Sequence, residues 1–342
     1  LIKQAKLMAS NPSERTICAR LMNDRFALCL PREEFDEKRV ADSIKELQRE
    51  FSGNSFHLHT YMGVYEIRDR DEAVSIMVDK ANIAADTIKN NYDCCVAYYD
   101  EHLLEISIEQ RRLLGEFEPA LQNDEFVMYL QPQVKRDGAA KGAEALVRWV
   151  HPSRGILTPY AFIDILENAG LIYKLDLYIW EKAAQKLAEW KEKGYGSYHI
   201  SVNISTKDFY IIDIYETFTG LINKYGIAAS NLHLEITETT LMTDFEKNMN
   251  IIHKLQDVGF RVEIDDFGSG YSSLNMLKDI SADVLKIDMG FLRKSENEVK
   301  GQDILESIIT LAGKIGMDVI TEGVETKKQL DMLTMMGCHE FQ

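Results

Sequence analysis

Two adjacent carboxylates mark the point where an apolar run of the chain ends. Asp265 and Asp266 directly follow residues 262–264, and the chain then passes through Gly268 and Gly270. Carboxylates about 4 Å apart repel each other by roughly 4 kcal/mol at an effective dielectric constant of 20, so a fold that gathers several of them needs cations. The pattern predicts a strand that delivers metal ligands to a loop. A solvated strand end before a glycine loop is the simpler alternative.

Oxygen-bearing side chains also lie in or directly after several other short apolar runs. They are Gln131, Glu144, Asn203, Glu235, Asp288 and Glu322. One such residue alone is more often a loop contact than a ligand. Several carboxylates that met in one place, however, would repel by more than a domain stable by about 5 to 15 kcal/mol can leave uncompensated. Hard divalent cations prefer oxygen ligands, so the set predicts one or two Mg²⁺ or Mn²⁺ ions rather than zinc or copper.

A lysine, Lys286, stands among these oxygen ligands in the sequence. A carboxylate-rich metal site with a neighbouring lysine suits hydrolysis of a phosphate ester, because the metals neutralise the phosphate and lower the pKa of water. Lys286 would then hydrogen-bond the attacking hydroxide or stabilise charge in the transition state. A salt bridge to Asp288, or to another residue of the same layer of the fold, is the structural alternative.

The elements that must position these residues begin near residue 124. From Glu125 onward strand-like and helix-like segments alternate, and Thr158-Pro159 opens one helix. Glycines close several of the helices: Gly194, Gly259, Gly316 and Gly337. The repetition predicts an α/β fold over residues 124–342, a (β/α)8 TIM-like barrel, with an open doubly wound sheet as the alternative. Functional residues of such barrels gather at the carboxyl ends of the strands, where the polar residues above are expected.

Residues 1–105 have a different pattern, which predicts a smaller α+β domain. Strands are expected at 26–30, 56–66 and 95–99, and amphipathic helices at 35–51 and 71–89. Arg20 to Phe26 is interpreted as a polar hairpin turn. Residues 106–123 carry apolar side chains at helical spacing and predict a connecting helix, either a surface helix or a relay between domains.

The composition argues against several classes of protein. A net charge of −16 disfavours a long nucleic acid as partner, because such proteins normally present a basic face. The five cysteines lack C-x-x-C spacing and the eight histidines form no H-E-x-x-H motif, so a disulfide framework and a histidine-based zinc site are not expected. No apolar run reaches the ~18 to 20 residues of a membrane span. We expect a cytoplasmic chain without membrane contact, with room for a sensor or membrane segment beyond its ends.

Seven motifs in residues 125–342 resemble, in order, those of the EAL domain of cyclic di-GMP phosphodiesterases. The signature Glu144-Ala145-Leu146 precedes Val147-Arg148-Trp149. The others are Gln131-Pro132, Ser201-Val202-Asn203, Leu234 to Glu238, Asp265 to Ser273, Leu285 to Asp288 and Thr321 to Glu325. The resemblance implies a barrel that hydrolyses one phosphodiester bond of cyclic di-GMP to linear 5′-pGpG.

The resemblance also implies roles for individual residues. The metal ligands are Glu144, Asn203, Glu235, Asp265 and Asp266, with Glu322 as a further ligand or proton acceptor. Lys286 lies at the attacking water and forms the catalytic set with Glu144 and Glu322. The substrate contacts are Gln131, Leu146, Arg148, Asp288 and Gln342. Glu238 holds the loop after Asp266, and pairing of two such domains near residues 266–273 implies a homodimer. Gln342 matches the glutamine after the penultimate barrel strand, which implies that the last barrel segment is absent.

A weaker resemblance relates residues 1–105 to the second half of a GGDEF (diguanylate cyclase) domain. It rests on Met22 to Phe26, placed before the strand that ends at Pro31. In that family paired glycines approach GTP and an acidic residue serves metal and catalysis, whereas Met22, Asn23 and Arg25 stand here. The resemblance therefore implies a degenerate, N-terminally truncated domain with a regulatory or structural role.

Three alternatives belong to other functional classes. A catalytically inactive cyclic di-GMP receptor is disfavoured because every matched metal position keeps an oxygen ligand and Lys286 is present. A protein kinase is suggested by Asp266-Phe267-Gly268, but an H-R-D loop and a glycine-rich phosphate loop are lacking. A dinucleotide-binding Rossmann domain is suggested by Gly268 and Gly270, but Ser273 stands at the third glycine position.

Overall fold

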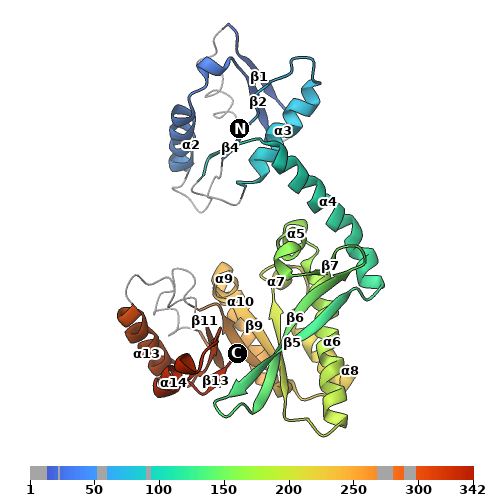
Figure 1. Ribbon diagram of the computed structural model, residues 1–342, viewed down its shortest axis with the longest axis vertical. Coiled ribbons are helices and arrows are strands. Elements are labelled where there is room, and N and C mark those ends of the chain that lie inside the picture. Colours follow the sequence, from blue (N-terminus) through green and yellow to red (C-terminus); the bar gives the residue numbers. More distant parts are fainter. Residues whose placement is uncertain (1–13, 22–23, 52–59, 90–93, 268–279, 289–297) are drawn as a thin grey trace. The chain divides into compact units, whose positions relative to one another are not determined.

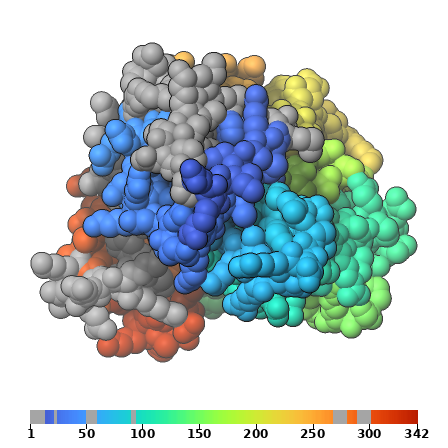
Figure 2. All heavy atoms as spheres, turned by 90° about the horizontal axis from the view of Figure 1, so that it is seen from above, coloured from blue at the N-terminus to red at the C-terminus, as the bar shows by residue number. Residues whose placement is uncertain are grey.

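The computed structural model describes residues 14–21, 24–51, 60–89, 94–267, 280–288 and 298–342, and the remaining residues are grey in Figures 1 and 2. The chain forms two compact units, residues 1–112 and 113–342. None of the helices in the described ranges is both long and apolar enough to cross a membrane.

The described part of the first unit contains two short sheets and two main helices. Strands β1 (Ile17–Arg20) and β2 (Phe26–Cys29) form an antiparallel hairpin, as predicted, although Met22 and Asn23 in its turn lie outside the described residues. Strands β3 (Met62–Val64) and β4 (Val96–Tyr98) form a separate parallel pair. The described strands thus make two small sheets in the α+β region that we predicted, and each strand spans only three or four residues.

Before residue 90, the described helices of the first unit are η1 (Arg32–Glu34), α2 (Glu37–Phe51) and α3 (Val74–Asp86), and α3 packs on β3 and β4. A Cβ at Gly63 would lie 1.8 Å from the carbonyl oxygen of Ala81, so only glycine lets α3 approach β3 this closely. A small core around Ile44, Cys95 and Val96 completes the unit.

Helix α4 (Glu101–Gln122) is the predicted connecting helix, and its second half belongs to the larger unit. Its Leu113, Phe117 and Ala120 are buried there. The rings of Phe117 and Phe126 meet at a centroid distance of 5.7 Å, and Phe126 lies 4.8 Å from Trp149. This aromatic cluster joins α4 to the first two strands of the following barrel.

Eight strands of the second unit form a closed ring, which confirms the predicted TIM-like barrel over the open sheet. In spatial order they are β5 (Phe126–Lys135), β13 (Glu340–Phe341), β12 (Asp318–Glu322), β11 (Val284–Asp288), β10 (Arg261–Asp265), β9 (Leu232–Thr237), β8 (His199–Ile204) and β6 (Ala140–His151). Strand β7 (Gly155–Leu157) pairs with β6 outside this ring.

The first barrel strand runs opposite to its neighbours. Strand β5 is antiparallel to both β6 and β13, whereas the other neighbouring strands of the ring are parallel. A tight turn at Asp137-Gly138, with Gly138 at φ 81°, returns β5 directly into β6. The barrel therefore begins with a hairpin rather than with a strand and helix, which differs from the uniform repetition that we predicted.

Helices connect the parallel strands and cover the barrel (Figure 1). They are η2 (Pro159–Ala161), α5 (Ile163–Ala169), α6 (Ile172–Glu192), α7 (Asp208–Ile211), α8 (Ile214–Tyr225), η3 (Ala229–Asn231), α9 (Glu238–Thr243), α10 (Phe245–Val258), α13 (Glu298–Lys314) and α14 (Lys327–Met335). The side chain of Asp213 caps α8, and Thr326 with Gln329 forms a capping box at α14. Gly259 ends α10 in the left-handed conformation, as its position predicted.

Candidate active site

Lys286 on β11 lies at the centre of the carboxylates that follow the barrel strands. Its Nζ is 3.1 Å from Oε2 of Glu144, 3.0 Å from Oε1 of Glu235, 3.3 Å from Oδ1 of Asp265 and 2.6 Å from Oε1 of Glu322. The four acids come from β6, β9, β10 and β12. Because these strands and β11 are parallel, their carboxyl ends meet at one end of the barrel. The structure thus brings together five of the residues that the sequence singled out.

This cluster is largely withdrawn from solvent. The side chains of Lys286 and Glu235 are 1% and 0% exposed, whereas that of Glu322 is 22% exposed. Neither carboxylate oxygen of Glu235 makes a hydrogen bond in the described part of the chain, although one of them lies in ion-pair range of Lys286. A buried carboxylate without hydrogen bonds is energetically unfavourable unless a cation balances it.

Burial and the neighbouring charges shift the pKa values of the residues in the cluster. Burial disfavours the charged amine of Lys286, but Glu235 and Glu144 above all raise its pKa well above its usual value. Burial raises the pKa of Glu235 well above its ordinary range, and the charge of Glu144 adds to the effect. Burial likewise raises the pKa of Glu322 to about 7, against the opposing influence of Lys286. Both acids are therefore harder to ionise here than a carboxyl group in water.

Glu144 is the exception among these acids. Burial alone would raise its pKa, but the charge of Lys286 and hydrogen bonds from Gln342, Lys286 and Asn203 lower it below the usual value. The amide of Asn203 donates to Oε1 of Glu144 at 3.1 Å, and Nε2 of Gln342 donates to Oε2 at 2.5 Å. Glu144 is therefore held as an oriented anion from both of its oxygens.

Asn203 and Asp266 complete the predicted ligand set. The carbonyl oxygen of Asn203 accepts a hydrogen bond from Nε1 of the buried Trp180 at 2.9 Å, which fixes its backbone at the end of β8. Asp266 has φ 55°, a left-handed conformation that turns the chain away from β10. The next amide, that of Phe267, donates to the carbonyl oxygen of Lys286 at 3.3 Å. This contact anchors the start of the loop beside β11.

The donor set fits a hard divalent cation. It consists of carboxylate and amide oxygens. The two oxygens of Glu235 make no hydrogen bond in the described residues, and only one of them lies within ion-pair range of Lys286, so both can bind a cation. Oxygen-rich sites of this kind suit Mg²⁺ or Mn²⁺. The residues that would hold the ion are Glu144, Asn203, Glu235, Asp265, Asp266 and Glu322.

The residues predicted to contact substrate lie around this cluster. Leu146 and Arg148 lie on the same face of β6 as Glu144. Strand β6 itself continues seven residues past Glu144, to His151. The guanidinium carbon of Arg148 lies 5.7 Å from the ring centroid of Tyr129, and its Nη1 donates to the carbonyl oxygen of Val147 at 2.8 Å. Gln131 is exposed and stands opposite Glu144 in the β5–β6 register. Asp288 is exposed at the end of β11, opposite Glu322.

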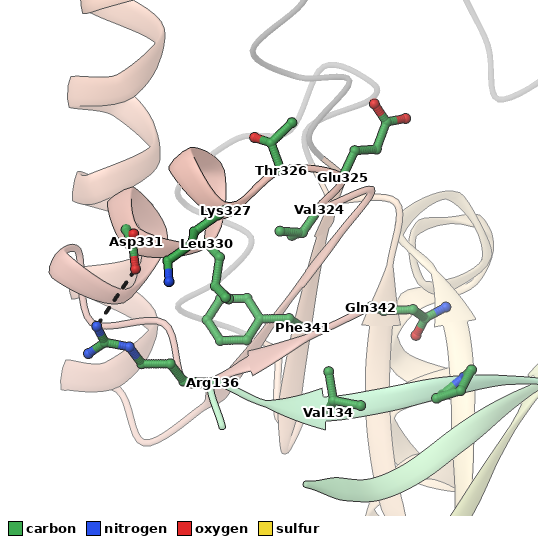
Figure 3. Close-up of a pocket in the computed structure, with 11 residues that line it drawn as sticks. Val134, Arg136, Val324, Glu325, Thr326, Lys327, Leu330, Asp331, Phe341 and Gln342 are labelled. Atoms are coloured by element: carbon green, nitrogen blue, oxygen red, sulfur yellow. Dashed lines mark ion pairs between the residues drawn. The ribbon is translucent and has the colours of Figure 1, made fainter. Parts of the chain in front are cut away.

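A pocket of about 460 Å³ lies beside the cluster, between β5, β13, the segment that follows β12 and helix α14 (Figure 3). Val324, Leu330 and Phe341 form its apolar wall. Arg136 and Asp331 make an ion pair at 3.7 Å on its rim. Gln342 lines this pocket and also contacts Glu144, so a single side chain connects the pocket to the carboxylates.

Comparison with protein families identifies the second unit. The family model described as the EAL domain matches residues 115–342, which is most of the chain. The chain belongs to the EAL domain family.

Named relatives match this EAL domain and in one case the whole chain. A Pseudomonas aeruginosa protein named bifunctional diguanylate cyclase/cyclic di-GMP phosphodiesterase MucR is 30% identical over 352 residues, which cover 100% of this chain and 51% of that protein. Cyclic di-GMP phosphodiesterase PdeR of Escherichia coli is 32% identical over 223 residues, 65% of this chain and 34% of that protein. The chain thus spans about half, or less, of the length of these relatives.

Solved structures share the fold of the EAL domain. A structure described as PaMucR phosphodiesterase in complex with c-di-GMP is 34% identical and matches with a TM-score of 0.64 over 68% of this chain and 94% of that chain. An EAL domain protein from Listeria monocytogenes is 28% identical, with a TM-score of 0.55 over 67% of this chain and 90% of that chain.

Glu238 stands at the first position of α9 in the EAL domain, directly after β9. Thr237 caps this helix by accepting a hydrogen bond from the amide of Thr240. The loop that Glu238 is predicted to hold includes residues 268–273, which lie outside the described residues. The same residues contain most of the predicted dimer contact, so both remain predictions.

The sequence did not reveal a second polar layer inside the EAL barrel. Its members are Gln133, His199, Ser201, His233 and Glu263, all of which are buried. The rings of His199 and His233 stack with centroids 3.8 Å apart, and Glu263 accepts from Nδ1 of His233 at 2.5 Å. The histidines are far apart in sequence and fit no ligand spacing. The available signal was a polar residue inside the apolar pattern of four separate strands, β5, β8, β9 and β10.

Proposed function

We propose that the EAL domain of this chain hydrolyses one phosphodiester bond of cyclic di-GMP to give 5′-pGpG, with Mg²⁺ or Mn²⁺ as cofactor. The observation that carries the proposal is the set of four carboxylates within 3.3 Å of Lys286 Nζ at the carboxyl end of a closed barrel. The names of MucR and PdeR support the substrate.

The residues of the cluster divide the work by position. When bound, a divalent cation supplies neutralisation of phosphate charge and acidification of water. Glu144 and Asn203 form a fixed pair on neighbouring strands, so they hold ligand oxygens in place. Glu322 is the most exposed of the four acids, and we assign its carboxylate to accept the proton of the attacking water.

Lys286 and the rim of β6 complete the reaction scheme. The water oxygen forms a bond to phosphorus while the bond from phosphorus to the 3′ oxygen breaks, and the 3′ oxygen takes up a proton to become a hydroxyl group. Nζ of Lys286 donates hydrogen bonds to the entering oxygen and offsets the charge that builds on the phosphate. Arg148 offers paired N–H donors to a phosphate. This displacement uses no covalent enzyme intermediate.

We also propose that the first unit is a degenerate GGDEF domain with a regulatory or structural role. The alignment with MucR, which covers the whole chain, supports this assignment. The side chain of Arg25 lies 4.0 Å from Asp86 rather than offering an oxygen ligand to a metal.

Turnover of cyclic di-GMP tests the proposal for the EAL domain. The protein is incubated with cyclic di-GMP and Mg²⁺ or Mn²⁺, and 5′-pGpG is followed by chromatography. Glu144→Ala is expected to abolish turnover, because it removes a ligand and the partner of three hydrogen-bonding groups. Asp318→Asn is the matched control, since this acid lies at the opposite end of the strand that carries Glu322 and pairs with Arg261.

Three outcomes are informative. Product from wild type and from Asp318→Asn, but not from Glu144→Ala, supports the enzyme. Tight binding of cyclic di-GMP without product under either metal identifies a receptor instead. Full turnover by Glu144→Ala refutes the site.

A further inference from the structure

The buried polar layer below the carboxylates is connected to Glu144 by one continuous hydrogen-bonded path. Nε2 of His199 lies 2.6 Å from Oε1 of Gln133, Nε2 of Gln133 donates to Oε1 of Gln342 at 3.1 Å, and Nε2 of Gln342 donates to Oε2 of Glu144. Gln133 is 0% exposed and His199 is 4% exposed. The path therefore crosses the barrel interior without a break.

The carboxylate of Glu144, at the end of this path, determines which group donates in each of its hydrogen bonds. Oε2 of Glu144 accepts from Nε2 of Gln342, so Gln342 presents its N–H group there and its carbonyl oxygen to Gln133. Gln133 must then present its own N–H group to Gln342 and its carbonyl oxygen to His199. Nε2 of His199 is left as the donor that starts the path. Burial and the neighbouring His233 lower the pKa of His199 to about 3, which keeps the ring neutral.

The backbone of the barrel makes room for the His199 ring. Gly142 on β6 pairs with His199 on β8, and a Cβ at Gly142 would lie 2.4 Å from Nε2 of that ring. A real Cβ does not fit there, so the glycine leaves the space that the ring occupies. The β5–β6 register skips Lys141 of β6 between the pairs Gln133–Gly142 and Val134–Ala140. Gln133 of β5 is fully buried beside this irregularity.

The His199 ring is held in place by stacking against His233, which bonds to Glu263. His233 stacks on it with an interplanar angle of 4°, and Glu263 accepts from His233 Nδ1 at 2.5 Å and from Ser201 Oγ at 3.2 Å. Two histidines and a carboxylate resemble a metal site in composition. However, lone pairs in parallel rings 3.8 Å apart do not converge on one ion, and Nε2 of His199 and Nδ1 of His233 already have partners.

We propose that His199 and Gln133 are positioning residues of the EAL site: they fix the amide of Gln342, and through it the orientation of Glu144 toward the cation. The inference rests on the proposed metal-dependent function. It assigns a role to two residues that touch neither substrate nor metal. Disturbing His199 or Gln133 leaves all ligands in place and frees Gln342 to turn away from Glu144.

A double-mutant cycle on metal binding tests the path without substrate. Mn²⁺ is titrated calorimetrically into wild type, Gln133→Leu, Gln342→Leu and the double variant. Each single change is expected to weaken Mn²⁺ binding by about tenfold, the lower end of the range for residues that orient metal ligands. The double variant is expected to lose about tenfold in all rather than about a hundredfold, because both changes cut the same path.

Two further variants probe the start of the path. His199→Phe keeps a stacked ring but removes its N–H donor. Gly142→Ala removes no polar group, but its methyl group displaces the His199 ring. Both are expected to weaken Mn²⁺ binding in the same direction. Ser281→Ala serves as a control for general effects of substitution, because its hydroxyl contacts only Gln256 among the described residues and lies outside the barrel interior.

The outcomes separate this inference from the proposed function. Unchanged Mn²⁺ affinity in both single variants, or additive losses in the double variant, overturns the positioning role even if melting temperatures fall. If wild type binds no Mn²⁺, the proposed function loses its cofactor, and the crystal structure of Gln133→Leu then decides the inference. A Gln342 side chain turned away from Glu144 supports it, and an unmoved one overturns it.

Discussion

Replacing Lys286 by methionine is expected to lower the stability of the metal-free protein, because the carboxylates lose the cation at their centre. Each of its four contacts, at 2.6 to 3.3 Å, corresponds to about 5 to 6 kcal/mol of attraction at an effective dielectric constant of 20, before desolvation is subtracted. Much of this attraction is offset by burial of the amine and by repulsion among the acids. Removing one partner of a buried ion pair typically destabilises a protein by about 3 to 5 kcal/mol, which is the loss expected here without metal.

The loss should depend on pH. Without the amine, the acids of the cluster bind protons more readily in the folded chain, so the folded state holds more protons than the unfolded one. Stability of Lys286→Met therefore falls further as pH rises, by about 1.4 kcal/mol per pH unit for each extra proton held. The difference from wild type is expected to be larger at pH 8 than at pH 5.5.

Urea unfolding of metal-free protein at both pH values measures this effect. Mn²⁺ is then added at about 100 times its dissociation constant, where binding stabilises a protein by about 2.7 kcal/mol. Lys182→Met is the control, because its amine pairs with Asp124 at the surface and such pairs contribute only about 0 to 1 kcal/mol. A metal-free Lys286→Met protein as stable as wild type at pH 8 would refute the reasoning.

Three further changes separate the roles of neighbouring residues. The pKa of Glu322 is raised from 4.5 to about 7, so its stabilising contribution is full below pH 4.5 and is lost by about pH 7, a fall of about 3 kcal/mol. Glu322→Gln should abolish that fall. If the free energy of unfolding, measured with urea, changed equally between pH 4.5 and 7 in wild type and Glu322→Gln, the result would contradict this prediction. Glu235→Gln should weaken Mn²⁺ binding at least about tenfold by calorimetry, because it replaces a buried carboxylate of the ligand set by a neutral amide. Trp180→Phe should lower stability by about 2 to 3 kcal/mol, since it leaves the carbonyl oxygen of Asn203 without its donor, and a thermal melt equal to wild type would exclude this contact.

The sequence predicted the carboxylate end of the barrel well because the rule that governs it is local. A polar residue directly after an apolar run lies at a strand end, and parallel strands bring those ends together. Glu235, Asp265 and Glu322 could be placed in this way from their own neighbours. The amine of Lys286 was expected beside the attacking water, and its contact with four acids follows from the same geometry.

The interior layer could not be predicted because nothing local defines it. His199 and His233 are 34 positions apart, and they meet only because β8 and β9 are neighbours in a fixed register. The partner of Gln133 lies at the other end of the barrel sequence, at Gln342. The hairpin of β5 and β6 was different, since Asp137-Gly138 between two strands is a recognised turn signal that the repeated pattern obscured.

The closure of the barrel and the order of its carboxylate site depend on the same segment. Glu340 and Phe341 of strand β13 make the pairs that join β12 to β5. The next residue, Gln342, donates to Glu144 through its side chain and to the carbonyl oxygen of Thr321 through its backbone amide. A substitution that shifts this segment would therefore disturb the ring of strands and release Glu144 from one of its two amide donors at the same time.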